Sequence, residues 1–273
     1  MIFFGAVVFN LLEVFWVIDP DMRKNANLEI TLFARLLHMT STELPRALPR
    51  HWSMQVDNAT AEGKNQTVAK FLAWLVWKKV FDSTELTEFS VGHTHNVQDQ
   101  RFAECATAIK WSHIQTPGDI LDVIHGRVKA RANRRLVCER IFGAHDWHDF
   151  FEVLGVSMHG HTQTHAMKMR NVEACHVWRF LRREDVQWDG VIETDWPEAE
   201  PHPSDVILLV KQHLDDSEYS QPPIVFVPDF CFQRLPSRPG GVDPRTKMSD
   251  RQVKEFSKTS KSVAAMPWKM EQA

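Results

Sequence analysis

The sequence of 273 residues predicts a mixed α/β fold, in which helices cover a sheet that has both parallel and antiparallel strands. Two β-rich runs near the start are separated by only a few residues, which predicts an antiparallel hairpin. Strand-like and helical patterns then alternate up to about residue 110, as is typical of βαβ units. Beyond residue 115 the periodic signal weakens, and we expect a mainly helical and irregular extension.

The hairpin is predicted over residues 2–9 and 13–19. This opening run is apolar enough to suggest a membrane span or a signal peptide. It has no basic segment and no small-residue cleavage site, however, and it contains Asn10 and Glu13. Since a charged residue near the middle of a span costs about 2.5–3.5 kcal/mol, two buried strands fit the run better than a membrane or secretory segment.

Five further elements follow the hairpin, and the last is a helix after residue 92 that carries Phe102, Cys105, Ala106 and Ile109 inward. A turn at 19–27 offers helix caps, and a helical segment follows at 28–39. Strands are predicted at 51–57 and 86–92. Between them, residues 65–81 form the clearest helix, because apolar residues recur at the helical period: Val68, Phe71, Leu72, Leu75, Val76 and Val80.

Net charge and cysteine spacing limit which ligands and which cellular compartment fit the sequence. The net charge is −3, so any nucleic-acid contact must come from a local basic patch. The four cysteines are widely separated without a CxxC pair, which argues against a cysteine-rich zinc site and favours a reducing, intracellular compartment. This leaves the nucleus open as the location.

The C-terminal half divides into two regions, at 113–195 and 196–273, after a core at 1–112. Residues 118–142 predict one or two helices with a basic face, which is either a solvated surface or a nucleic-acid contact. Residues 196–244 are rich in proline, with one ordered piece at 205–214, and the last thirty or so residues are polar enough to be disordered. The candidate nucleic-acid contacts are Arg127, Lys129, Arg131, Arg134 and Arg135.

Two carboxylates stand out as candidate metal ligands. Asp57 ends a predicted strand, where α/β sheets collect functional groups, although Asp-Asn is also ordinary turn chemistry. Asp99 precedes Phe102 and Ala106 by three and seven positions, so we expect it on their inward-facing stripe. A carboxylate in the first helical turn is also favoured by the helix dipole, by ~0.3–1 kcal/mol. Two converging carboxylates would suit Mg²⁺ or Mn²⁺ and phosphodiester chemistry.

The histidines near these acids leave their role open. His93 and His95 alternate in an extended segment and would not share a face, so loop hydrogen bonding and metal ligation both remain. A second group, at 159–165, could hold a transition metal but lacks supporting acids or cysteines. At 144–153, Asp146 is placed as a helix N-cap rather than as a metal ligand.

Residues 48–102 resemble the core of an uncharacterised, multi-copy eukaryotic domain thought to derive from DDE-type transposases. The family's motifs QxDN, ENKN and VGHTHxxxDQxF stand here as "QVDN", "EGKN" and "VGHTHNVQDQRF", and residues 17–37 are similar to the family's upstream segment. The resemblance implies a ribonuclease-H-like fold, two Mg²⁺ or Mn²⁺ ions and DNA as the partner, with neither a membrane nor a small-molecule cofactor.

Carried over by position, Asp57 would be the second acid of the catalytic triad and Asp99 the third. The motif residues without an assigned role are Asn58, Glu62, Lys64, Asn65, His93 and His95. Gly63 replaces the family's usual asparagine. In this fold the first acid lies on a central strand upstream of the hairpin, so we expect an N-terminally incomplete domain that is inactive or severely impaired.

Two alternatives stay open. The first is a domesticated, non-catalytic module that binds nucleic acid or protein, which a missing acid would favour. The second is a metallophosphoesterase, because those enzymes also carry a strand-end "GHTH". They need further upstream metal-binding motifs, however, and none appears before residue 91.

Overall fold

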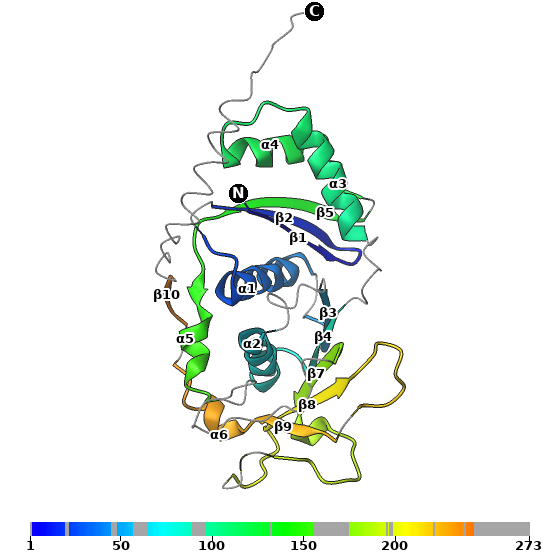
Figure 1. Cartoon of the computed structure of the whole chain (residues 1–273), viewed down its shortest axis with the longest axis vertical. Helices are drawn as coiled ribbons and strands as arrows, with labels where there is room; N and C mark the ends of the chain where they lie inside the picture. The colour runs from blue at the N-terminus through cyan, green and yellow to red at the C-terminus, as the bar shows by residue number, and fades with distance from the viewer. Residues whose placement is uncertain are drawn as a thin grey trace, which may run out of the picture.

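The computed structural model is an α/β structure with two mixed sheets (Figure 1). It describes residues 2–19, 22–44, 48–56, 65–88, 97–131, 133–155, 175–194, 196, 199–220, 222–236 and 239–242. Among these residues, one sheet has the order β1-β2-β5 and a second the order β3-β4-β7-β8-β9, while β10 and β6 form a short pair. The predicted α/β class is confirmed.

Strand β2 is the centre of the first sheet. β1 (Ile2–Val8) and β2 (Leu12–Ile18) form the predicted antiparallel hairpin, and Asn10 in its turn takes a left-handed backbone conformation, with φ 56°. Every residue of β2 is buried. Its even-numbered residues pack against α1 and its odd-numbered residues face α3 and α4, so the apolar run is explained by burial on both faces.

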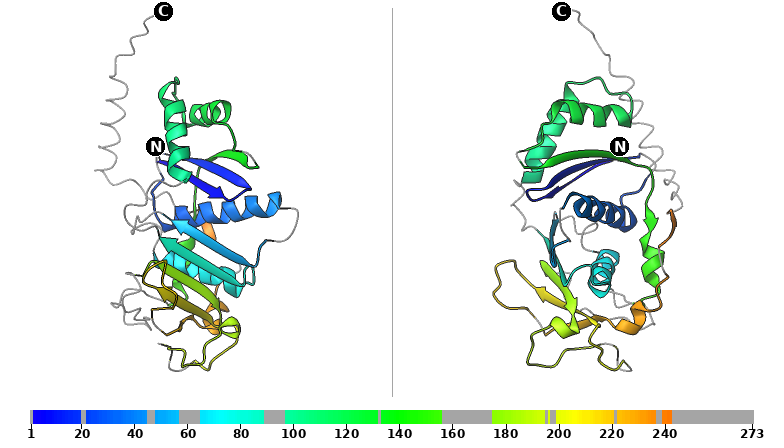
Figure 2. Two further views of the ribbon diagram at one scale, coloured as in Figure 1. Left: turned by 90° about the vertical axis from the view of Figure 1, so that its right-hand side faces the viewer. Right: turned by 180° about the vertical axis from the view of Figure 1, so that it is seen from behind.

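Helix α1 (Ala26–Glu43) lies between the two sheets (Figure 2). Leu28, Leu32 and Leu36 form one stripe that packs on β2. Ile30 and Phe33 turn toward the second sheet, where the Phe33 ring meets the Trp52 ring edge-on at 6.5 Å. The helix therefore joins two hydrophobic cores.

Strands β3 (His51–Val56) and β4 (Ser83–Glu88) are parallel neighbours connected by α2 (Gln66–Trp77). The predicted stripe of α2 is buried except for Val80, which is 39% exposed because the helix ends at Trp77. β4 begins three residues before the strand predicted at 86–92, and of that prediction the structure describes only residues 86–88.

The C-terminal half contains more strand than expected. α4 (Pro117–Arg127) is a helix as predicted, but β5 (Arg135–Ile141) is a strand parallel to β2, so the helical expectation for those residues is wrong. The residues of β5 pair along the whole length of β2, and this long-range partner overrides their local pattern. Asn133, with φ 63°, precedes the strand.

The second sheet continues antiparallel from β4 through three strands: β7 (Val177–Arg182), β8 (Val206–Lys211) and β9 (Ile224–Val227). β8 confirms the ordered piece predicted at 205–214. The division into regions at residues 112 and 195 stays a prediction, although β4 and β7, on either side of residue 112, pair within one sheet.

The remaining elements are short: β6 (His145–Asp146), α5 (Trp147–Glu152), the 3₁₀ turn Arg183–Asp185, α6 (Asp229–Phe232) and β10 (Gly240–Val242).

A buried ion cluster attaches helix α3 (Val97–Lys110) to the first sheet. Glu13 of β2 is fully buried, and its carboxylate contacts Arg101 Nη2 at 2.5 Å and Arg134 Nη1 at 2.9 Å. Arg101, 1% exposed, also pairs with Glu104 and donates to the Lys129 carbonyl oxygen at 3.0 Å. The charge that argued against a membrane span is thus neutralised inside the protein.

The structure also bears on the apolar start of the chain. That segment forms the β1–β2 hairpin, and no helix in the described part of the chain is long and apolar enough to cross a membrane.

Replacing Arg101 by methionine is expected to lower the free energy of unfolding by about 3–5 kcal/mol, because Glu13 would lose its main buried partner. The double variant Glu13→Leu with Arg101→Met should lose less than the single variant, since no carboxylate is then left buried. Urea unfolding of the variants measures both values.

Arg35→Met provides the control, because the Arg35–Glu139 pair is exposed and should contribute about 0–1 kcal/mol. Equal effects of Arg101→Met and Arg35→Met would show that the buried cluster does not stabilise the fold as described.

Candidate functional site

The candidate site begins at one edge of the second sheet. Val56, the last residue of β3, pairs with Glu88, the last residue of β4. Because parallel strands end at the same edge, the chain leaves both strands there. Asp57 follows Val56 directly, and the segment after Glu88 leads into α3. Asp57, Asn58, Glu62, Lys64, His93 and His95 themselves lie outside the described residues.

Asn65 is the one residue of the "EGKN" motif that the structure describes. It is the N-cap of α2, and its side-chain oxygen accepts hydrogen bonds from the backbone N–H groups of Thr67 and Val68 at 3.0 and 2.9 Å. These two bonds satisfy donors that the first helical turn leaves without partners. The motif therefore fixes where α2 begins.

Asp99 lies in the first turn of α3 and is exposed, so its predicted place on the inward-facing stripe is wrong. Among the described side chains of α3, Arg101 and Cys105 are buried, while Phe102 is half-buried against the rings of Phe3 and Phe15. An arginine occupies a core position because Glu13 faces it, which an apolar pattern cannot reveal. Asp99 is accessible from solvent, and its approach to Asp57 stays a prediction.

Glu88 is an acid that the sequence reasoning missed. It is only 3% exposed, and its Oε2 lies 4.0 Å from Nδ1 of His176, whose ring stacks on that of His213 at 6.0 Å. These groups lie at the edge where Asp57 follows β3. In the sequence Glu88 falls inside the strand predicted at 86–92, so nothing marked it as a strand end, and its burial depends on β7, far away in the sequence.

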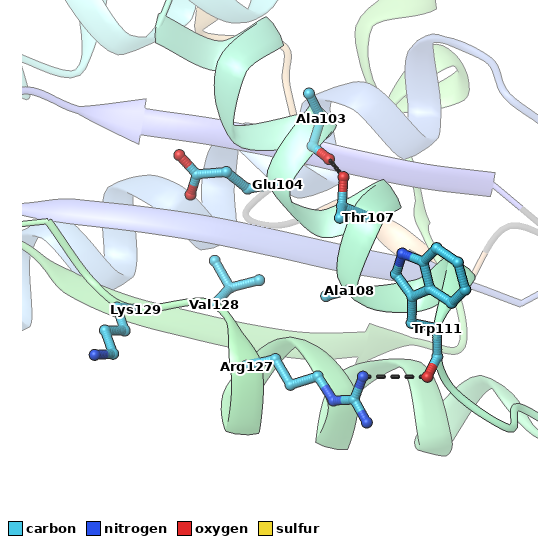
Figure 3. Close-up of a pocket in the computed structure, with 8 residues that line it drawn as sticks. All are labelled: Ala103, Glu104, Thr107, Ala108, Trp111, Arg127, Val128 and Lys129. Atoms are coloured by element: carbon cyan, nitrogen blue, oxygen red, sulfur yellow. Dashed lines mark hydrogen bonds between the residues drawn. The ribbon is translucent and has the colours of Figure 1, made fainter. Parts of the chain in front are cut away.

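The predicted basic face is divided between ion pairs and a groove. Arg134 pairs with Glu13, Arg135 with Glu43, and Arg131 with Glu104 at 3.3 Å. Arg127 and Lys129 instead line a groove beside α3 (Figure 3). Three of the five candidate contacts are therefore engaged by carboxylates, and Arg127 and Lys129 line the groove.

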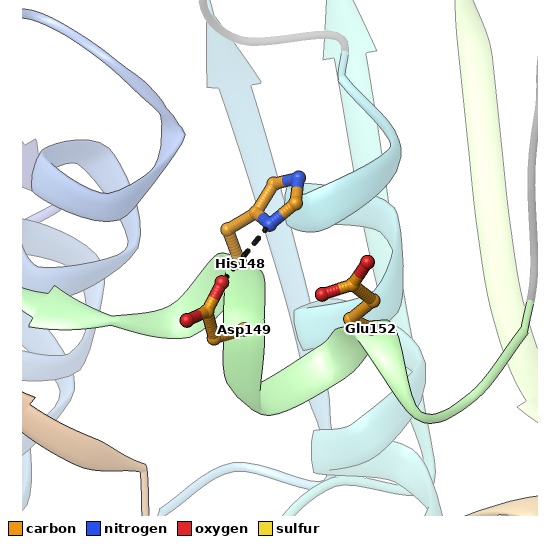
Figure 4. Close-up of side chains that lie close together, drawn as sticks. All are labelled: His148, Asp149 and Glu152. Atoms are coloured by element: carbon orange, nitrogen blue, oxygen red, sulfur yellow. Dashed lines mark ion pairs between the residues drawn. The ribbon is translucent and has the colours of Figure 1, made fainter.

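A cluster on α5 brings three potential ligand atoms within 4.8 Å of one another, from His148, Asp149 and Glu152 (Figure 4). All three side chains are exposed. The Asp146 side chain accepts from the Asp149 backbone N–H at 3.1 Å, which confirms the predicted N-cap. The cluster is accounted for as the solvated face of a short helix, and the histidines at 159–165 lie outside the described residues.

Lys70 of α2 is a buried cation, 6% exposed, near this cluster. Burial lowers its pKa from 10.5 to about 8, and the Glu152 carboxylate acts in the opposite direction. A lysine with this pKa is still mostly protonated at neutral pH. It therefore places a buried positive charge beside the α5 cluster and opposes binding of a cation there.

Three of the four cysteines are unreactive thiols. Burial raises the pKa of Cys105 and Cys231 to about 11 and that of Cys138 to about 12. Thiols with these values stay protonated at neutral pH, so they are poor nucleophiles and poor metal ligands. The four cysteines form no disulfide.

Lys70→Met is expected to raise the free energy of unfolding at pH 7 by roughly 1–3 kcal/mol, because a buried ammonium is replaced by an apolar chain of similar length. Between pH 8 and about 10.5 the folded wild type has lost this proton while the unfolded chain keeps it, so wild-type stability rises with pH and the gain shrinks.

Urea unfolding at pH 7 and pH 9.5 measures the difference, with the exposed Lys129→Met as a matched control. A gain that is equal at both pH values would contradict the lowered pKa.

Comparison with known proteins identifies a family. No curated protein and no solved structure matches the sequence. A family model, described as a domain of unknown function (DUF7869), matches residues 4–186, which include most of β1, all of β2 and the β3–α2–β4 unit. Since the match covers more than half of the 273 residues, the chain belongs to the DUF7869 family.

Proposed function

We propose that this chain is a ribonuclease-H-like domain of transposase origin, whose ancestral activity was metal-dependent cleavage or strand transfer of DNA. Asp57 and Asp99 are its two candidate metal-binding carboxylates. We expect this chain to be inactive or severely impaired, because only two of the three acids that the chemistry needs are assigned in it. The main support is topological: an antiparallel hairpin, a helix and two parallel strands follow one another in the order that such a fold requires.

The free edges of the two sheets support the idea of a further strand. Within the described residues, β1 pairs only with β2, and β3 only with β4. Helix α1 packs on both sheets, and side chains of β1 and of β3 belong to the two cores that it joins. One strand that pairs with β1 and β3 would join the sheets, and an acid on it would complete the triad.

The accessible parts of the site fit a divalent cation. Asp99 is exposed in the first turn of α3, where a hydrated ion can reach its carboxylate. Mg²⁺ or Mn²⁺ would supply activation of a water or hydroxyl group and stabilisation of the leaving oxygen. Asn65 positions the start of α2 after the strand end that carries Asp57. Glu88, buried at the same edge, is a further carboxylate near that strand end.

A non-catalytic nucleic-acid module is the second candidate. The observation that favours it is the groove lined by Arg127 and Lys129, whose lining residues do not include Asp99. The two functions differ in one measurable respect. A binding module holds nucleic acid equally well with and without divalent metal and never cleaves it.

The proposal predicts that the purified chain nicks supercoiled DNA weakly or not at all with Mn²⁺ or Mg²⁺. A fusion that supplies an acid-bearing strand from a family member should nick DNA with Mn²⁺. In that fusion, Asp57→Ala or Asp99→Ala should lower the nicking rate roughly 100-fold or more, since each removes a metal ligand worth several kcal/mol in the transition state.

Asp149→Ala in the same fusion is the matched control, because Asp149 is an exposed acid on α5. If each of the single variants Asp57→Ala and Asp99→Ala still nicks DNA at the rate of the unsubstituted fusion, the assignment of these two acids as metal ligands is refuted. Robust nicking by the unmodified chain, abolished by Asp57→Ala, would refute its predicted inactivity. Small phosphoesters hydrolysed in a way that depends on His93 and His95 would favour a metallophosphoesterase instead.

A further inference from the structure

The groove beside α3 has a volume of about 660 Å³ and an aromatic end (Figure 3). Trp111 stands at one end and Lys129 at the other, with Ala108 and Val128 between them and Arg127 along one side. This volume lies in the range of pockets that hold small ligands, about 300–1,000 Å³. The groove is therefore large enough for a nucleotide unit.

Trp111 presents its indole ring to solvent. Its relative exposure is 71%, one of the highest among large apolar side chains in the described residues. The Nζ atom of Lys110 lies 5.4 Å from the ring centroid. An exposed indole beside a cation is a surface on which a nucleobase can stack, because every base has an aromatic face.

Hydrogen bonds fix the Arg127 guanidinium and the backbone of Lys129 along the groove. Arg127 donates from Nη1 to the Trp111 carbonyl oxygen at 3.2 Å, which keeps its guanidinium beside the aromatic end. The backbone carbonyl of Lys129 accepts a hydrogen bond from the buried Arg101 at 3.0 Å, while its side chain is exposed. The backbone that carries Lys129 is thus anchored to the buried ion cluster.

Glu104 is the one acid among the groove's lining residues, and its charge is already compensated. Its Oε2 pairs with Arg101, and its Oε1 lies 3.3 Å from Nη2 of Arg131. The carboxylate therefore does not oppose a bound phosphate as an isolated charge would. The remaining charged groups, Arg127 and Lys129, are both positive.

We propose that this groove binds single-stranded nucleic acid, with a base stacked on Trp111 and backbone phosphates at Arg127 and Lys129. The choice of nucleic acid over an acidic peptide rests on the proposed function and on the indole, since a peptide of acidic side chains has no flat aromatic group to stack. The site deepens that function, because it would hold a nucleic-acid strand on the same chain without using Asp99.

The test is fluorescence anisotropy of a labelled oligothymidylate about 20 nucleotides long, with the full chain in EDTA so that metal chemistry plays no part. Trp111→Ala should weaken binding roughly 5- to 150-fold, the loss expected from one stacked base. Trp111→Phe should recover most of the affinity because it restores an aromatic face. Trp188→Ala, at another exposed tryptophan, should leave binding unchanged.

Arg127→Gln and Lys129→Gln should each reduce the slope of log affinity against log salt by about 0.7, the value for one phosphate contact on a single strand. Wild-type binding weaker than about 10⁻⁴ M at physiological salt would overturn the proposal. So would Trp111→Ala binding as tightly as wild type, or polyglutamate displacing the oligonucleotide at equal charge concentration.

Binding in EDTA also separates this site from the proposed cleavage site. Asp99→Asn should bind the oligonucleotide normally, since Asp99 is not among the groove's lining residues. Loss of affinity in Asp99→Asn equal to that in Trp111→Ala would contradict a separate groove. Failure of the nicking experiment with intact, Trp111-dependent binding would leave the groove standing and would refute only the cleavage function.

Discussion

The two-sided burial of α1 is the constraint on which the rest of the structure depends. Leucines on one side of the helix pack on β2, while Ile30 and Phe33 contact the core of the second sheet. Polar groups of the same helix hold the segment at the start of α5, because Thr31 Oγ1 accepts from the Trp147 indole and from the His145 backbone N–H, each at 3.1 Å. The helix thereby sets how the edges of β1 and β3 lie relative to each other, and these are the edges between which a further strand would complete the proposed fold.

Local sequence patterns were sufficient for the elements whose partners are near in the chain. The β1–β2 hairpin, α2 and the cap at Asp146 were all visible, since their signals are alternation, helical period and a side chain that accepts from a nearby backbone N–H group. The capping role of Asn65 was not predicted. The sequence did not reveal β5, because its strand character comes from pairing with β2, more than a hundred residues earlier. It also misplaced the buried face of α3. Arg101 is buried only because Glu13 on a distant strand faces it, and a charged residue in a helix pattern is ordinarily assigned to solvent.

The candidate site was likewise predictable only in part. The parallel pairing of β3 and β4 places the ends of both strands at one edge, as the alternation of strands and helices implied. Glu88 and its neighbour His176 were not foreseen, since burial of that acid requires β7 beside β4. The basic run was predicted as one surface, but three of its five candidate residues neutralise acids of the fold, and only the remaining pair lines a groove. A count of charges along the chain cannot separate these two uses.

The central claim is that Asp57 and Asp99 share a divalent metal at the edge where β3 and β4 end. The most direct measurement is a crystal structure of the protein soaked in Mn²⁺, with the metal located from its anomalous scattering. The account predicts a manganese peak within about 2–2.6 Å of a carboxylate oxygen of both residues. A manganese site that engages neither acid, or carboxylates too far apart to share one ion, would contradict it.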